Sequence, residues 1–270
     1  MSRKRIINVI KKEWQVIATD LNSILLITIV PLLIVGEFTV MIWLISKFGS
    51  QAILASTLFQ GAISKMLAAI PGAGLLPPTE QLQVALLSQF NFYLLLIPTM
   101  IAVTFATFSI VDEKTSGSLE ALLATPVRTW ELLLGKALSG AIPALVVTWV
   151  YAAIFLGAVT IMGWGNLISL VLNPAWFLFL FLLTPAIAVL SFLLGVIGSS
   201  RAKDAKNAQN YVLLIILPML ALIALQVTGI MWFTTALSIV LGLAIAMADI
   251  IVLRVAVSLF QRESIVVRWR

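Results

Sequence analysis

Long uncharged stretches of apolar residues alternate with short polar segments along this chain. A helix needs roughly 20 apolar residues to cross the hydrocarbon core of a bilayer, which is about 30 Å thick. Stretches of that length lie at about residues 24–46, 92–111, 137–162 and 176–198. The pattern therefore predicts a membrane-spanning helix at each of these positions.

A further apolar tract, residues 211–253, is too long for one crossing. As a single helix it would measure about 64 Å, roughly twice what a bilayer needs. A polar, glycine-containing step at residues 226–229 is typical of a tight turn near its middle. We therefore expect two spans here, at about 211–228 and 232–254, and six spans in total.

The distribution of basic residues predicts the orientation, because short cytoplasmic loops are enriched in lysine and arginine. With six spans, Lys47 and Lys65 fall on one side, and all the other basic residues fall on the side that holds both termini. We expect both termini to be cytoplasmic and the chain to be a multi-pass protein of the cytoplasmic (inner) cell membrane. Anionic lipid headgroups meet this basic side, so the net charge of +6 requires no nucleic-acid partner.

Residues 1–23, which precede the first span, have a different pattern. Apolar side chains recur at helical spacing, at Ile6, Ile7, Ile10, Trp14 and Ile17. Basic and polar side chains lie mostly on the opposite face, which predicts an amphipathic helix in the cytoplasmic interface. Such a helix either anchors the first span or acts as a lever that also contacts a cytoplasmic partner.

The longest predicted connection, residues 47–91, lies on the outer side. Its segment 52–70 is apolar but is interrupted by polar residues such as Lys65, so we expect it to lie on the outer leaflet without crossing. Steps containing proline at residues 71–74 and 77–78 prevent one continuous helix.

The composition excludes most catalytic chemistry. Hydrophobic residues make up 61% of the chain, and it contains no cysteine and no histidine. Disulfides, imidazole metal ligands and Ser/His/Asp triads are therefore absent. Gly135-Lys136 lacks the other residues of a phosphate-binding GxxxxGK[ST] loop. We expect no catalytic site, no metal site and no bound cofactor, and any ATP must be hydrolysed by another chain.

The polar segment 112–136, between spans two and three, is the candidate functional region. Gly117 and Pro126 interrupt helical structure there. The apolar positions between these two breaks are Leu119, Leu122 and Leu123. On a helix these leucines share one face, away from Glu120, which predicts a helix of one or two turns with an apolar docking side. The alternative is a loop that only reverses the chain.

At this segment the sequence resembles type-2 ABC exporter permeases. The resemblance rests on EKTSGSLEALLATPV at residues 113–127, followed by ELLLGK at 131–136. The family pattern is approximately Glu-x-x-x-Gly-Thr/Ser-Leu-Glu-x-Leu-Leu-x-Thr-Pro-Val, then Glu-Leu-Leu-Leu-Gly-Lys. The six-span layout and the basic N-terminal helix also fit, but only residues 113–136 are specific.

The resemblance implies that Gly117 to Ala124 forms a coupling helix, with the three leucines docking a cytoplasmic ABC ATPase and Glu120 making a polar contact. Glu113 would lie at the cytoplasmic end of span two. The site residues are Glu113, Gly117, Leu119, Glu120, Leu122, Leu123, Thr125 and Pro126. The resemblance further implies two ATPase copies that carry ATP and Mg²⁺, and two permease copies, in a homodimer or with a close paralogue. The transport path would follow the seam between the permeases.

Ionisable residues inside spans are costly and mark candidate functional sites. Glu37, in span one, either lines a water-filled path, binds a cationic substrate, or pairs with Lys47 or Lys65. Span two adds three polar candidates for the path, Thr99, Thr104 and Thr107. Asp249 lies about one turn from Arg254, and we expect an interfacial ion pair between them.

The predicted fold is an all-α polytopic membrane protein in which residues 1–270 form a single transmembrane permease domain. The predicted function is a non-catalytic permease subunit that moves a substrate outward across the membrane, driven by ATP hydrolysis in a separate subunit. The main alternative is a secondary transporter or channel that is powered by an ion gradient and uses Glu37 and Asp249. A membrane-embedded enzyme is disfavoured, because the chain lacks histidine, cysteine and a paired carboxylate motif.

Overall fold

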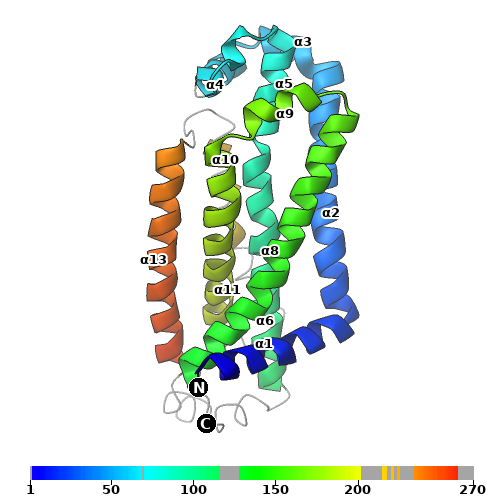
Figure 1. The fold of residues 1–270 in the computed structure, drawn as a ribbon. Coiled ribbons are helices and arrows are strands. Elements are labelled where there is room, and N and C mark those ends of the chain that lie inside the picture. Colours follow the sequence, from blue (N-terminus) through cyan, green and yellow to red (C-terminus); the bar gives the residue numbers. More distant parts are fainter. Residues whose placement is uncertain are drawn as a thin grey trace.

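The computed structural model describes residues 2–68, 70–115, 128–201, 215–217, 220–221, 224–225 and 234–260. In these residues the secondary structure is helical and contains no strand, which confirms the predicted all-α class. The longest helices run side by side in a bundle (Figure 1). They are α2 (Leu21–Leu44), α6 (Phe90–Thr115), α8 (Thr129–Ile161), α11 (Thr184–Arg201) and α13 (Thr235–Leu259).

Five helical stretches in the described part of the chain are long and apolar enough to cross a membrane. They are Leu21–Ala55, Pro78–Val111, Thr129–Ile161, Pro174–Ser200 and Thr235–Leu259. The fourth stretch joins α10 (Pro174–Leu178), a π-helical turn η3 (Phe179–Leu183) and α11. The predicted span at 211–228 lies mostly outside the described residues, so the count of six remains a prediction.

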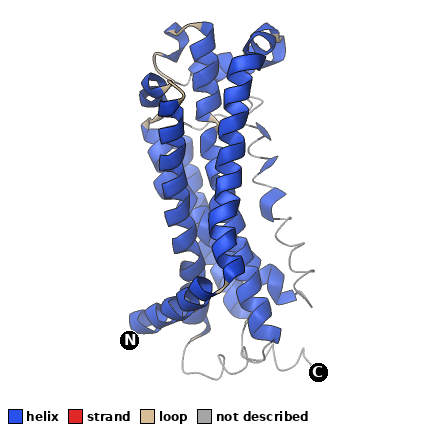
Figure 2. Ribbon diagram, turned by 90° about the vertical axis from the view of Figure 1, so that its right-hand side faces the viewer, coloured by secondary structure: helices blue, strands red, loops and turns tan. Residues whose placement is uncertain are grey.

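Helix α1 (Ser2–Thr19) runs across one end of the bundle, which we call the base (Figure 1). Figure 2 shows the same arrangement from the side. The chain turns between α1 and α2 at Asp20, whose carboxylate accepts hydrogen bonds from the backbone N–H groups of Asn22 (3.3 Å) and Ser23 (2.8 Å). This N-cap satisfies amides at the start of α2 and fixes where the first long helix begins.

The opposite end of the bundle carries short helices, and we call it the cap end (Figure 1). They are η1 (Ile45–Gly49), α3 (Ser50–Ala55), α4 (Thr57–Ala68), η2 (Ala73–Leu75), α5 (Pro78–Ser88) and α9 (Gly165–Val171). Helices α3 and α4, which include most of the apolar segment 52–70, lie at the cap end, and the expected position of this segment on the outer leaflet stays a prediction. Gly72 adopts a left-handed φ of 82° between α4 and η2, a conformation that glycine adopts without steric cost.

The core is densest where α6 packs on α11. A Cβ atom on Gly195 of α11 would lie 2.8 Å from the Cβ of Ala106, so only glycine allows this close approach. Nearer the cap end, α2, α6 and α8 meet through Phe38, Phe90 and Phe155, and the last two rings stack. Of the five apolar stretches, those of α2 and α13 are the least buried. Their outer faces are therefore free to contact lipid or another chain.

Candidate functional site

The structure describes the two flanks of the predicted coupling region. Residues 112–115 form the last turn of α6, and residues 129–136 form the first turns of α8. Seven predicted site residues lie outside the described part of the chain: Gly117, Leu119, Glu120, Leu122, Leu123, Thr125 and Pro126. The observable site is therefore built from Glu113, from the ELLLGK motif and from the helix that contacts them.

Helix α8 begins with a cap provided by Glu131 of that motif. The Glu131 carboxylate accepts a hydrogen bond from the backbone N–H of Arg128, at 3.1 Å. A carboxylate in the first turn also interacts favourably with the helix dipole. Arg5 of α1 lies 3.5 Å from the same carboxylate oxygen, Oε2. The start of α8 is thereby tied to α1.

Lys136 provides a positive charge inside the protein, with only 1% of its side chain exposed. Its Nζ lies 2.9 Å from Glu113 Oε1 and 3.1 Å from Glu13 Oε1, and it donates to Ser109 Oγ at 2.5 Å. The three ammonium protons therefore have three acceptors. A buried ammonium without such partners would be far too costly to remain charged.

Lys12 of α1 adds a second cation next to the same carboxylates. Its Nζ lies 3.2 Å from Glu113 Oε1 and 3.5 Å from Glu13 Oε1. Ser109 also donates to Glu13 Oε2, at 3.1 Å. We call Lys12, Glu13, Ser109, Glu113 and Lys136 the base cluster. Its two positive and two negative charges cancel, and its members come from α1, α6 and α8.

The charge of Lys12 is stabilised by this setting. Burial alone would lower the pKa of Lys12, but the carboxylates of Glu113 and Glu13 outweigh burial through attraction and hydrogen bonding. The pKa of Lys12 consequently lies above its ordinary value. Lys12 therefore stays protonated at physiological pH.

Two further contacts hold α1 against α8. The indole N–H of Trp14 donates to the backbone carbonyl of Ser139, at 3.0 Å. A Cβ atom on Gly135 would lie 2.9 Å from the Cβ of Val9, so the glycine of ELLLGK lets the two helices touch. The motif thus supplies a cap, a close contact and a buried charge, at Glu131, Gly135 and Lys136.

The resemblance implied that Glu113 lies at the cytoplasmic end of span two, and in the structure Glu113 lies in the last turn of α6. Sequence reasoning did not predict that α1 would supply Lys12 and Glu13 as partners. A signal was present, since Glu13 falls at the same helical spacing as Ile6, Ile10 and Ile17. An acidic residue on the apolar face of a helix indicates a buried partner of opposite charge.

Glu37 forms no ion pair with Lys47 or Lys65 in the described part of the chain. Its side chain is exposed on α2, and the Lys47 ammonium instead lies 5.1 Å from the ring centre of Trp43. Of the three alternatives for Glu37, the pairing with Lys47 or Lys65 is therefore not realised. That Glu37 lines a water-filled path or binds a cationic substrate stays a prediction.

Asp249 and Arg254 are both described, and the expected ion pair between them is not formed. Five residues along a helix separate two side chains by about 140° around its axis. Asp249 is half-buried while Arg254 is exposed. The expectation was wrong because a separation of three or four residues, not five, brings helical side chains together.

The predicted threonines of α6 lie in or near the packed interior. Thr99 and Thr107 are buried, whereas Thr104 is partly exposed. The hydroxyls of Thr99 and Thr104 donate to backbone carbonyls one turn earlier, at Leu95 and Met100. Their role in a transport path remains a prediction.

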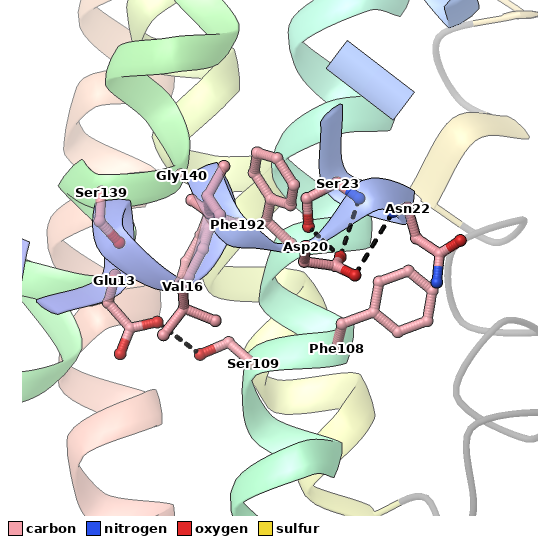
Figure 3. A pocket seen from close by; sticks show the side chains of 12 residues that line it. Glu13, Val16, Asp20, Asn22, Ser23, Phe108, Ser109, Ser139, Gly140 and Phe192 are labelled. Atoms are coloured by element: carbon pink, nitrogen blue, oxygen red, sulfur yellow. Dashed lines mark hydrogen bonds between the residues drawn. The ribbon is translucent and has the colours of Figure 1, made fainter. Parts of the chain in front are cut away.

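A cavity of about 490 Å³ adjoins the base cluster at the turn between α1 and α2 (Figure 3). Glu13 and Ser109 belong to both the cluster and the cavity wall. None of the three predicted path threonines lines it. Within the described residues, no group of acidic side chains forms a metal-binding cluster.

The model of a known family, described as ABC-2 family transporter protein, matches residues 7–248 of this chain. The chain belongs to the ABC-2 transporter family. The ABC-2 match confirms the resemblance and includes the whole base cluster. ABC-2 membership and the apolar helices together identify a multi-pass membrane protein of an ABC transporter. Members are typically non-catalytic membrane subunits, and the family implies an ATPase partner. Searches of curated protein sequences and of solved structures give no match.

Proposed function

We propose that this chain is the permease subunit of an ABC exporter, and that it couples ATP hydrolysis by a separate ATPase to outward movement of a substrate. Family membership and the motif at residues 113–136 support this proposal. The base cluster is the observation that carries it. The cluster joins Glu113 and Lys136, which flank the predicted coupling helix in sequence, to each other and to α1.

The base cluster holds the two ends of the proposed coupling segment, at Glu113 and Lys136, rigidly relative to each other. Breaking a buried ion pair by removing one partner typically costs about 3–5 kcal/mol. A displacement of the segment between Glu113 and Lys136 is therefore transmitted to α6, α8 and α1 together. The N-terminal helix acts as the lever that its sequence suggested, in addition to anchoring the first span.

The proposed docking surface is the leucine face of residues 117–124, with Glu120 beside it and Thr125-Pro126 ending the helix. The distribution of basic residues supports a cytoplasmic position for this end of the bundle. ATP and Mg²⁺ bind to the partner, because this chain has no phosphate-binding loop. Helix α11 ends at the base and α13 begins at the cap end (Figure 1), which supports a sixth span between them.

We place the transport path at a seam between two copies of the permease, with α2 contributing to it. Glu37 is exposed on α2 among apolar side chains such as Leu33 and Val40. A carboxylate facing lipid near the bilayer centre costs about 2.5–3.5 kcal/mol or more, whereas a seam filled with water avoids this cost. Thr99 and Thr107 are buried here, so they join the path only when α6 moves.

Co-purification with the cognate cytoplasmic ATPase, followed by measurement of ATP turnover, tests the proposal. Leu122→Asp should abolish binding of the ATPase and its stimulation, because it places a charge on the apolar docking face. Leu75→Asp is the matched control, since Leu75 is 92% exposed at the cap end, and it should change neither. Unchanged binding and turnover in Leu122→Asp would reject the docking surface. Transport by the purified chain in vesicles without ATP would favour the ion-driven alternative.

A further inference from the structure

The cavity at the turn between α1 and α2 has the size of a small-molecule site. Its volume of about 490 Å³ falls within the range of roughly 300–1,000 Å³ that is usual for ligand pockets. Residues of α1, α2, α6, α8 and α11 contribute to its wall, so it lies inside the fold and not on one helix (Figure 3). Val16, which is 54% exposed, marks where it reaches the surface.

One part of the wall is aromatic and the other part is polar. Phe105, Phe108 and Phe192 supply three rings. Among the described residues that line the cavity, the charged ones are Glu13 and Asp20, and none is a lysine or arginine. A ligand in this cavity therefore meets negative charge and aromatic faces, a combination that favours cations.

The serine hydroxyls around the cavity already donate hydrogen bonds within the protein. Ser23 donates to Asp20 Oδ2 (2.7 Å), Ser109 donates to Glu13 Oε2 (3.1 Å), and Ser139 donates to the carbonyl of Lys136 (2.7 Å). Their remaining capacity is to accept. The amides at the start of α2, which would attract an anion, are bonded to Asp20.

Asp20 is the carboxylate best placed to contact a ligand, because Glu13 is already paired with Lys136. Hydrogen bonds from the Ser23 hydroxyl and from backbone amides hold the pKa of Asp20 below its ordinary value. Asp20 is therefore ionised at neutral pH. Its oxygens retain the capacity to accept another hydrogen bond beyond those from Asn22 and Ser23.

We propose that this cavity binds amphipathic molecules that carry an ammonium head, with the head near Asp20 and the apolar body against Phe105, Phe108 and Phe192. The negative charge of Asp20, with no basic side chain among the described residues of the wall, disfavours amphiphiles with anionic heads. Binding of these molecules requires this chain only and does not require the ATPase. That these molecules are the transported cargo rests on the proposed function.

The test uses the purified full-length chain in nanodiscs of a glycolipid with an uncharged sugar headgroup, which carries no ammonium group, without ATPase or ATP. Binding of radiolabelled dodecyltrimethylammonium below its micellar concentration is measured against empty nanodiscs, with dodecyl sulfate as the anionic counterpart. We expect saturable binding of the cation and none of the anion. Equal binding of both, or no saturable binding of the cation, would overturn the proposal, and neither result bears on ATPase docking.

Two variants separate charge from volume. Asp20→Asn removes the charge but keeps the cap, because asparagine caps helices as well as aspartate does, and it should weaken cation binding about tenfold. Val16→Trp should fill the opening and abolish binding. Glu80→Gln removes one charge at the cap end and should change nothing. Unchanged affinity in both Asp20→Asn and Val16→Trp, with melting temperatures equal to that of the parent, would refute the site.

Nanodiscs that also contain phosphatidylethanolamine identify the source of the ligand. If this lipid competes with the labelled cation, the ammonium head that occupies the cavity in cells comes from the bilayer. If the affinity is unchanged, the site selects single-chain cations. Both results support an ammonium site, whereas competition by phosphatidylglycerol, an anionic lipid, would contradict it.

Discussion

Lys136 Nζ lies 2.9 Å from Glu113 Oε1, so the start of α8 and the end of α6 are joined by a buried ion pair. The two residues flank the segment that we propose as the coupling helix. Any force applied to that segment therefore acts on two long helices that are already connected. Helix α1 strengthens the connection from the side through Lys12 and Glu13.

Replacing Lys136 should therefore break the ion pairs of the base cluster and destabilise the fold. We expect Lys136→Met to lower the free energy of unfolding by about 3–5 kcal/mol, because it leaves two carboxylates without their shared buried cation. Denaturant titration in detergent measures this loss. Arg254→Met, which removes an exposed basic residue of α13, is the control and should cost little.

A second substitution checks the cause of that loss. Adding Glu113→Gln to Lys136→Met removes one of the stranded charges and should recover part of the stability, so the two effects should not be additive. Simple additivity of the two single variants would contradict an interaction between these residues.

The contact of α1 with α8 predicts opposite effects for two glycines of the same helix. Gly135→Ala should destabilise the protein by about 1–3 kcal/mol, because the new methyl group would overlap Val9. Gly157→Ala places a methyl group where no atom lies within 4 Å, and it should stabilise α8 by about 0.5–1 kcal/mol. Thermal unfolding of both variants tests the prediction, and equal effects would refute the close approach.

The raised pKa of Lys12 predicts a loss of stability at alkaline pH. A group whose pKa is higher in the folded state stabilises that state fully below its ordinary pKa, near 10.5, and loses this contribution as the pH rises through the folded value. Unfolding measured between pH 9 and 12 should show this loss. Lys12→Met should remove part of it, whereas Lys11→Met, at an exposed position without an ion pair among the described contacts, should not.

The proposed seam along α2 predicts selective crosslinking. The chain contains no cysteine, so single cysteines can be introduced without background. Val40 of α2 and Leu243 of α13 are both 56% exposed. With a short thiol crosslinker in native membranes, Val40→Cys should give a covalent dimer and Leu243→Cys should not. The reverse result would move the seam to α13.

The sequence predicted the fold class well because crossing a bilayer imposes a strong pattern. Apolar runs at 24–46, 92–111 and 176–198 fall within continuous helical stretches, and the run at 137–162 ends one residue beyond α8. The helix ends were less accurate. Helix α8 begins at Thr129, although span three was predicted to begin at residue 137, because Glu131 caps the helix and buried acceptors neutralise Lys136.

The candidate site could be predicted only in part. Glu113 and the ELLLGK motif stand out as a local polar pattern, whereas their partners in α1 are distant in sequence. The hydrogen bond from Lys136 to Glu13 joins residues 123 positions apart, and no local periodicity reports such a contact. The cavity likewise needs residues from five helices to meet.

The long sequence separations within the base cluster also constrain how the protein is made. When α1 leaves the ribosome, Glu13 lacks its buried partner, since Lys136 is synthesised 123 residues later. The helix must wait in contact with water and lipid headgroups until α6 and α8 have inserted. Closure of the base is therefore a late step in biogenesis, and a chain truncated before residue 136 leaves its first helix undocked.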